Sequence, residues 1–336
     1  MRAAVNALAI LSAAAALEAA PRVAAAEEDA APPGRSAREG ADRWVPSLAP
    51  TFGASFQHWE GALESEICRG CTFPNPMSQS LRAAASGDDR DVTPFFGGNL
   101  ELMTPELPLP ARPRLFVGGE ILATFGVDRT IAREGDPGTI GSPFPAGTTL
   151  QPFNEDTALG QGSETIATLG SPFYGAYTGV AFPFQVYGRR LRIKPAFAWM
   201  RYTVDVEGLV VDAECLDRTT APTNLCNTIS ATQQGVLREI RLEGSDTGTF
   251  NGIGPGLDIE MDTGVLGPLG TSIFLGGRAY RVLGDRKVEF DSTESFPNQG
   301  PGLSADETRG QWSFEADPWM YRVFVGLRVQ WLGFAD

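Results

Sequence analysis

Histidine is nearly absent from this chain of 336 residues, which contains one histidine and four cysteines. Metal and catalytic sites draw heavily on histidine and thiolate ligands, and His58 alone offers little for such a site. Basic residues are also scarce, because 27 lysines and arginines stand against 41 aspartates and glutamates, giving a formal net charge of -14. Nucleic-acid-binding proteins usually present a basic face. The composition therefore predicts no metal site, no cofactor and no nucleic-acid partner.

Long apolar runs are also missing after the first two dozen residues. A membrane-spanning helix needs about 20 apolar residues, which argues against a helical membrane protein. The N-terminus has the order of a secretory signal peptide, with Arg2, an apolar core over 5–17 and small residues at 24–26. We predict a signal peptide over residues 1–26 and export to the periplasm. Residues 27–49 combine Ala, Pro, Gly and charge without periodicity, which predicts a flexible periplasmic linker.

The chain does contain eight stretches in which apolar and polar residues alternate, as they do along β-strands. The gaps between these stretches alternate between short and long. The short gaps are 104–113, 187–190 and 262–270, and the long gaps pass through Cys68 and Cys71, through 136–170, through Cys215 and Cys226, and through 296–310. Outer-membrane β-barrels show this rhythm because their strands turn tightly on the periplasmic side and form longer loops outside.

Each stretch has one apolar face and one face of small or polar residues. In Leu115–Val127 the odd positions are apolar or glycine, whereas the even positions include Glu120 and Thr124. Glycines on the polar face and aromatic residues near strand ends favour a membrane barrel over a soluble one. The sequence predicts an all-β fold, a transmembrane antiparallel up-and-down β-barrel of eight strands. Ten strands are the alternative, if Val236–Glu243 belongs to a separate pair.

The last stretch carries a more specific pattern. Its residues, Tyr-Arg-Val-Phe-Val-Gly-Leu-Arg-Val-Gln-Trp-Leu-Gly-Phe, resemble the C-terminal strand that the barrel assembly machinery recognises in outer-membrane proteins. Gly326, Val329, Trp331 and Phe334 match its spacing, although the chain continues for two more residues. Residues 50–336 as a whole resemble the small OmpA- or OmpX-type barrels. The resemblance implies a location in the outer membrane of a Gram-negative envelope, with the assembly machinery, membrane lipid and lipopolysaccharide as partners.

Charged residues also occur at positions that the alternation turns inward. Eight strands enclose an interior just wide enough for side chains to fill, and an unpaired buried ion is strongly destabilising. We therefore expect these charges to pair near the periplasmic ends of their strands and to close the lumen. A narrow gated pore, whose opening exchanges the partners, is the alternative. The predicted network consists of Glu101, Glu120, Arg192, Lys194, Asp258, Glu260, Arg278 and Arg328.

The cysteines form two pairs in the sequence. In a reducing compartment the spacing of Cys68 and Cys71 would suggest redox chemistry or half of a zinc site. In an exported protein, an even number of cysteines indicates disulfides instead. We expect Cys68 to pair with Cys71 and Cys215 with Cys226, each within its own external loop.

His58 lies at the end of the first strand, near Ser55, Glu64 and Ser65. Some small outer-membrane barrels modify lipid A and use histidine with serine or aspartate. A nucleophile and its base need hydrogen-bond geometry, which proximity in sequence does not show, so no catalytic residue is assigned. Near the outer strand ends, Arg129, Arg133 and Arg201 are candidates for contact with lipid phosphates.

The predicted function is non-enzymatic: an outer-membrane barrel with a structural or surface-interaction role and a lumen largely closed by paired charges. Three alternatives stay open at this point. They are a small porin or ion channel, an enzyme that modifies lipid A or another surface lipid, and a soluble β-barrel.

Overall fold

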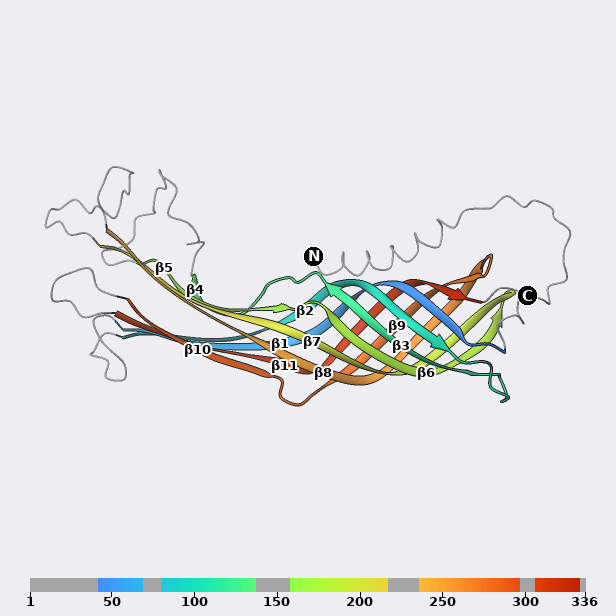
Figure 1. Ribbon diagram of the computed structural model, residues 1–336. Helices are drawn as coiled ribbons and strands as arrows, with labels where there is room; N and C mark the ends of the chain where they lie inside the picture. The colour runs from blue at the N-terminus through green and yellow to red at the C-terminus, as the bar shows by residue number, and fades with distance from the viewer. Residues whose placement is uncertain (1–41, 69–79, 137–157, 217–235, 297–305, 333–336) are drawn as a thin grey trace. The chain divides into compact units, whose positions relative to one another are not determined.

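The computed structural model describes residues 42–68, 80–136, 158–216, 236–296 and 306–332. They belong to one compact unit, Gly40–Asp336, and form one antiparallel sheet (Figure 1). Its strands are β1 (Val45–Cys68), β2 (Ser80–Met103), β3 (Arg114–Thr124), β4 (Arg129–Asp136), β5 (Ala158–Leu169), β6 (Phe173–Val186), β7 (Arg189–Leu216), β8 (Val236–Leu266), β9 (Leu269–Leu283), β10 (Lys287–Phe296) and β11 (Asp306–Trp331). The described residues include no helix long and apolar enough to cross a membrane.

Eight of these strands close into a ring. Their order around the ring is β1-β2-β3-β6-β7-β8-β9-β11, which follows the chain apart from β4, β5 and β10, and β11 pairs with β1 to close it. This arrangement confirms the predicted antiparallel up-and-down barrel and its eight strands. The ten-strand alternative is wrong, because Val236–Glu243 is the first part of β8. That strand pairs with β7 without interruption, from Leu216↔Val236 to Leu191↔Met261.

The three tight turns lie where the short gaps predict them. Residues 104–113 join β2 to β3, Tyr187 and Gly188 join β6 to β7, and Gly267 and Pro268 join β8 to β9. Tyr187 and Gly188 both have positive φ, 49° and 74°, as the common two-residue hairpin turn requires. These turns gather at one end of the ring, which we call the tight-turn end.

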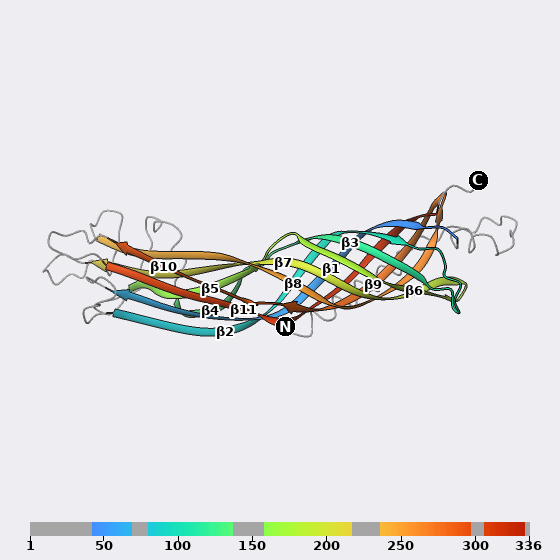
Figure 2. The ribbon, with the colours of Figure 1, turned by 60° about the horizontal axis from the view of Figure 1, so that its bottom comes forward.

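At the opposite end, the long strands β1, β2, β7, β8 and β11 continue beyond the ring (Figures 1 and 2). There β10 pairs with β11, and the β4–β5 hairpin pairs with β7. In this part the single sheet consists of two runs of four paired strands, β10-β11-β1-β2 and β4-β5-β7-β8, which we call the two sheets of this part. We call this part the projecting section; it comprises residues 59–68, 80–91, 129–136, 158–169, 203–216, 236–249, 287–296 and 306–315.

The two sheets of the projecting section pack against each other. A Cβ atom added to Gly208 of β7 would lie 2.2 Å from the Trp312 ring on β11, and one added to Gly61 of β1 would lie 2.5 Å from Ile131 on β4. Glycine at these two positions allows the close approach. Between the sheets lies a small apolar core of Leu63, Ile67, Ala132, Val210, Leu242 and Trp312.

The first strand begins before the expected barrel boundary. β1 starts at Val45 rather than at Pro50, because Val45 and Ala49 are buried inside the ring and their backbones pair with β2. The predicted linker therefore overlaps β1 over 45–49. The predicted signal peptide, 1–26, and most of the linker lie outside the described residues.

The prediction of a loop over 136–170 is wrong for its second part, because residues Ala158–Leu169 form β5. The inward side chains of β5 include Ser163 and Thr165, both buried. Only the last two inward side chains, Ala167 and Leu169, are apolar, so the alternation of apolar residues is too short to mark this strand in the sequence. β5 exists because its backbone pairs with β7 and β4 on its two sides.

The outward face of the ring is an apolar band. It extends over Leu48–Phe56 on β1 and Val92–Leu102 on β2, and Ile121 on β3 is 60% exposed. The outward positions predicted for Leu115–Val127 are thereby confirmed. Aromatic side chains border the band: Trp44, Tyr187 and Trp331 at the tight-turn end, and Tyr174, Trp199, Trp319 and Tyr321 at the projecting end.

Candidate functional site

The interior of the ring near the tight-turn end holds a cluster of charged side chains centred on Glu260. Its carboxylate accepts hydrogen bonds from Arg192 Nη1 at 2.8 Å and Lys194 Nζ at 3.2 Å, and lies 3.4 Å from Arg328 Nε. Ser272 Oγ and Gln330 Nε2 donate to Glu260 Oε1 at 2.7 and 2.6 Å. Glu260 is fully buried, so three cations and two neutral donors replace the water that its carboxylate has lost.

Two more carboxylates complete this first cluster. Glu101 Oε1 lies 2.5 Å from Lys194 Nζ and 2.6 Å from Arg328 Nη1. Asp262, which is partly exposed at the end of the interior, pairs with Arg192. Three carboxylates thus face three cations. We call Glu101, Arg192, Lys194, Glu260, Asp262 and Arg328 the lower cluster.

A second cluster lies farther from the tight-turn end. Glu120 pairs with Arg322 Nη1 at 2.7 Å and with Arg278 Nη1 at 3.5 Å. Arg278 Nη2 also lies 3.5 Å from Asp258 Oδ2. All four side chains are buried. We call Glu120, Asp258, Arg278 and Arg322 the upper cluster, in which two carboxylates face two cations.

Aromatic rings and glycines shape the space around both clusters. Arg278 stacks 4.2 Å over the Tyr177 ring, Lys194 lies 4.6 Å over Phe116, and Arg322 lies 4.7 Å over Phe95. A Cβ atom added to Gly175 would lie 2.6 Å from Glu120 Oε1, and one added to Gly276 would lie 2.4 Å from Asp258 Oδ1. The inward glycines predicted from the sequence therefore make room for the charges.

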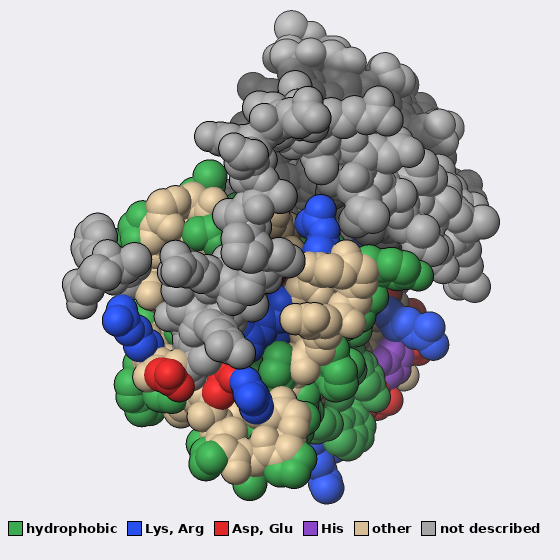
Figure 3. Space-filling model, turned by 90° about the vertical axis from the view of Figure 1, so that its right-hand side faces the viewer, with side chains coloured by type: hydrophobic (Ala, Val, Ile, Leu, Met, Phe, Trp, Pro, Cys, Tyr) green, Lys and Arg blue, Asp and Glu red, His purple; other side chains and the backbone are tan. Residues whose placement is uncertain are grey.

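The two clusters balance their own charge. Eight of the ten members are the residues of the predicted network, and the structure brings all eight together. Asp262 and Arg322 are absent from that prediction. The sequence pattern could have predicted Arg322, because alternation places it on the same inward face of β11 as Arg328. Figure 3 looks onto the tight-turn end, where acidic and basic side chains lie among hydrophobic ones.

Beyond the upper cluster, aromatic and amide side chains fill the interior. Gln57 Nε2 donates to Tyr202 Oη at 3.0 Å, and Trp59 Nε1 donates to Gln57 Oε1 at 3.3 Å. The Trp59 ring contacts Phe314 at 5.5 Å, and Tyr202 contacts Phe250 at 5.4 Å between centroids. All five side chains are buried. A charged layer and an aromatic layer thus follow one another inside the same set of strands.

Asp91 lies just beyond the apolar band, with its side chain inward. Burial raises the pKa of Asp91 to about 6, against the opposing effects of a hydrogen bond from Thr93 and the charge of Arg129. The Arg129 Nε atom lies 3.7 Å from Asp91 Oδ1. Arg129 therefore pairs with a carboxylate. Arg133 does so too, because its Nε atom lies 3.7 Å from Glu164 Oε2.

The histidine does not meet the serines near it in sequence. His58 Nε2 lies 3.8 Å from Asp88 Oδ2 at the surface of the projecting section. Ser55 and Ser65 point inward and are buried, and Ser65 Oγ is 2.7 Å from Ser163 Oγ. Neither Ser55 nor Ser65 therefore reaches His58; Ser86 and Ser313 line the same surface hollow as His58, but no hydrogen bond joins either of them to it among the described residues. The described residues also contain no group of three or more His, Cys, Asp or Glu side chains placed closely enough to hold a metal ion.

Other predicted features lie at the limits of the described residues. Cys68 is buried at the end of β1 and Cys215 belongs to β7, whereas Cys71 and Cys226 lie outside the described residues. Both disulfides therefore stay predictions. Gly326, Val329 and Trp331 lie on β11, and Phe334 lies outside the described residues, so the assembly signal also stays a prediction.

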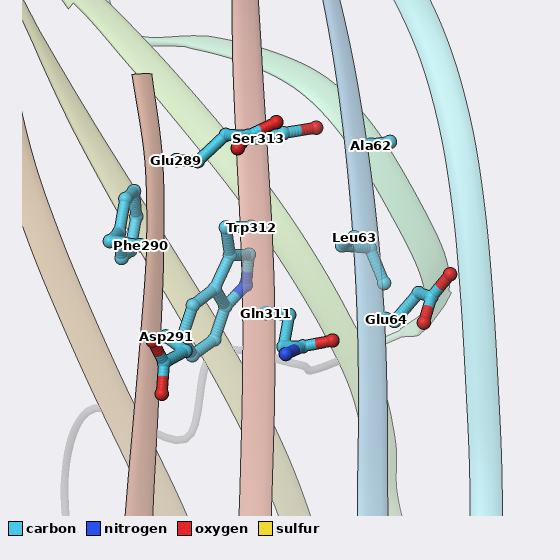
Figure 4. Close-up of a pocket in the computed structure, with 9 residues that line it drawn as sticks. All are labelled: Ala62, Leu63, Glu64, Glu289, Phe290, Asp291, Gln311, Trp312 and Ser313. Carbon is cyan, nitrogen blue, oxygen red and sulfur yellow. The ribbon is translucent and has the colours of Figure 1, made fainter. Parts of the chain in front are cut away.

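A surface hollow of about 540 Å³ lies on the projecting section (Figure 4). Three neighbouring strands, β1, β10 and β11, line it. Phe290 and Trp312 stack with centroids 5.3 Å apart, and Glu64, Glu289 and Asp291 supply carboxylates. No cation lines this hollow among the described residues, which makes it unsuited to anions.

Comparison with known proteins gives no family. No family model and no curated protein matches the chain. Among solved structures, the outer membrane protease OmpT from Escherichia coli is 9% identical with a TM-score of 0.25, over 84% of this chain and 96% of OmpT. The outer membrane protein OprG from Pseudomonas aeruginosa is 10% identical with a TM-score of 0.22, over 88% of this chain and 99% of OprG.

A third similarity is to the Salmonella secretin InvG, which is 10% identical with a TM-score of 0.16, over 88% of this chain. The chain spans 65% of one InvG chain and 46% of another. Because all of these TM-scores lie below 0.5, no property of these proteins is transferred to the chain.

Proposed function

We propose that the chain is a bacterial outer-membrane β-barrel with a structural or surface-interaction role, and that paired charges close its lumen. The observation that carries this proposal is the distribution of side chains over the ring. Large apolar residues face outward and charged residues face inward, which is the reverse of a soluble barrel. A lipid-facing apolar band between aromatic rims is typical of transmembrane barrels.

The length of the band supports the same proposal. On β1 it covers the nine residues from Leu48 to Phe56, and a tilted transmembrane strand needs about 9–11. The closed ring also leaves no unpaired strand edge within the band, as a bilayer demands. In the proposed orientation the tight turns face the periplasm and the projecting section lies outside the cell.

The closed lumen follows from the two clusters and the aromatic layer. Water-filled channels occur in larger barrels, whereas side chains fill an eight-stranded one. Here the two clusters place five acidic and five basic side chains in the interior, Arg114 is buried near the lower cluster, and Trp59, Phe250 and Phe314 lie buried beyond the clusters. An ion crossing the ring would have to displace both layers.

Two measurements test the proposal. Heat-modifiable migration on a gel reports a folded barrel, and single-channel recording in planar bilayers reports a pore. We expect a mobility shift on boiling and no conductance above that of the bare bilayer. A protein that stays in the soluble periplasmic extract and does not shift would contradict the membrane location, and steady conductance would contradict the closed lumen.

One observation favours a second candidate, a narrow gated pore. Arg322 Nη2, Arg328 Nη2 and Glu101 Oε2 are buried without a hydrogen-bond partner among the described residues. Such atoms leave room for an exchange of partners or for internal water. If the barrel conducts, Glu120→Ala and Arg328→Ala should change the conductance, whereas Glu64→Ala on the exposed face of the projecting section should not.

A further inference from the structure

One sector of the apolar band carries cations at its projecting edge. Arg201 on β7 and Arg281 on β9 are both exposed, and neither forms an ion pair with another described residue. They differ in this from Arg129 and Arg133, which lie next to carboxylates. Of the three arginines that the sequence suggested for lipid contact, only Arg201 is therefore available.

The strand register places Arg201 and Arg281 close together. Arg201 is opposite Asn251 on β8, and Arg281 is opposite Ile253 on the same strand. With strands 4.7–4.9 Å apart and a rise of about 3.3 Å per residue, the two Cα atoms are roughly 12 Å apart. Two long, flexible guanidinium side chains can approach one headgroup from both sides of that span.

Aromatic side chains surround the two arginines. Arg281 is opposite Trp319 on β11, Arg201 is opposite Tyr174 on β6, and Trp199 is two residues from Arg201. Trp319 and Tyr321 stack with centroids 6.4 Å apart. Tryptophan and tyrosine gather where a membrane meets water, so this row marks the level of the lipid headgroups.

The charge around the ring is uneven at this level. On β1 and β2 the outward residues are of mixed charge. Arg90 is opposite His58, Asp88 Oδ2 lies 3.8 Å from His58 Nε2, and Glu60 lies farther out. The sector over β7, β8 and β9 instead presents Arg201 and Arg281, and the first carboxylate along β7 is Asp205, whose Oδ1 accepts from Thr247. Arginine binds phosphate oxygens bidentately. The sector is therefore complementary to an anionic headgroup held at the edge of an apolar band.

We infer that Arg201 and Arg281 form a binding site for the phosphates of a phosphorylated outer-leaflet glycolipid, the lipid A part of lipopolysaccharide. The inference rests on the proposed membrane location and specifies one partner of that location. The acyl chains lie along the apolar band below the arginines, and the aromatic row supports the sugar–phosphate level between them.

The experiment compares lipid A with its dephosphorylated form, both added in mixed micelles to the detergent-purified full chain. The variant Arg201→Gln/Arg281→Gln is compared with the wild type and with Arg112→Gln/Arg189→Gln. The control pair removes the same charge from two exposed arginines at the tight-turn end. We expect the wild type and the control to bind phosphorylated lipid A at least about tenfold more tightly than the dephosphorylated form, and the variant to lose that preference.

The possible outcomes separate the inference from the function on which it rests. If the barrel shows heat-modifiable migration but the variant keeps the preference, the inference is wrong and the membrane location stands. If inorganic phosphate displaces lipid A as well as unlabelled lipid A does, the site binds free phosphate and the lipid assignment is wrong. If the chain neither shifts on heating nor enters detergent micelles, the membrane location is wrong and the lipid site fails with it.

Discussion

Neutralising Glu260 is the most direct test of the charged interior. Glu260→Gln keeps an oxygen that can accept from Ser272 and Gln330, so the variant removes charge rather than shape. It leaves Arg192, Lys194 and Arg328 facing only Glu101 and Asp262, an excess of one positive charge in a buried cluster. Removing one partner of a buried ion pair costs about 3–5 kcal/mol, and we expect that loss in the free energy of unfolding.

A second substitution turns this expectation into a measurement of pairing. Lys194→Met alone leaves one excess negative charge, but Glu260→Gln/Lys194→Met restores neutrality in the lower cluster. Because Lys194 Nζ lies 3.2 Å from Glu260 Oε2, we expect the double variant to be more stable than additivity predicts, by about 1–3 kcal/mol.

The assay is equilibrium unfolding in urea, with the barrel refolded into lipid vesicles and followed by tryptophan fluorescence and gel mobility. Glu64→Gln provides the matched control, because Glu64 is exposed on the projecting section and should change stability by less than about 0.5 kcal/mol. A Glu260→Gln variant as stable as Glu64→Gln would refute the reasoning. So would strict additivity in the double variant.

Three further outcomes follow from single positions. Gly175→Ala should destabilise the barrel because its Cβ would lie 2.6 Å from Glu120 Oε1, whereas Gly264→Ala, with nothing within 4 Å, should fold normally on the same mobility gel. Because the folded-state pKa of Asp91 is raised from 3.8 to about 6, stability should fall as pH rises from about 4 to about 6, and unfolding titrations of Asp91→Asn should lack this loss of up to about 3 kcal/mol. Trp312→Ala should cost about 3–5 kcal/mol in the core of the projecting section and increase its proteolysis, yet leave heat-modifiable migration of the ring intact; loss of the mobility shift would contradict this separation.

The sequence predicted the face of each charged residue but not its partner. Alternation with a period of two shows that Glu120 and Arg322 both point inward. Their contact joins positions 202 residues apart, and it depends on the register of every strand between β3 and β11. A shift of one residue would turn a whole strand over. The sequence therefore could not predict which charged residues form ion pairs, even where it correctly predicted that they point inward.

The projecting section was harder to predict for a related reason. A strand is visible in sequence when one of its faces is apolar, as in Leu115–Val127. β5 instead turns Ser163 and Thr165 inward, and its partner β7 supplies Val210 to the core between the sheets. Backbone pairing with β4 and β7 stabilises β5. Because its own sequence lacks a clear apolar face, the sequence analysis predicts a loop there.

The placement of charge also bears on how deeply the proposed barrel inserts. Because the lower and upper clusters contain equal numbers of acidic and basic groups, they contribute nothing to the net charge of -14. The excess of negative charge therefore lies outside the two clusters. Part of it is on the projecting section, which exposes Glu60, Glu64 and Glu289 on the outer face of one sheet. Carboxylates cannot enter the hydrocarbon without a large cost. An acidic section directly beyond the aromatic row would therefore stop the barrel at that row, the level at which Arg201 and Arg281 meet the headgroups.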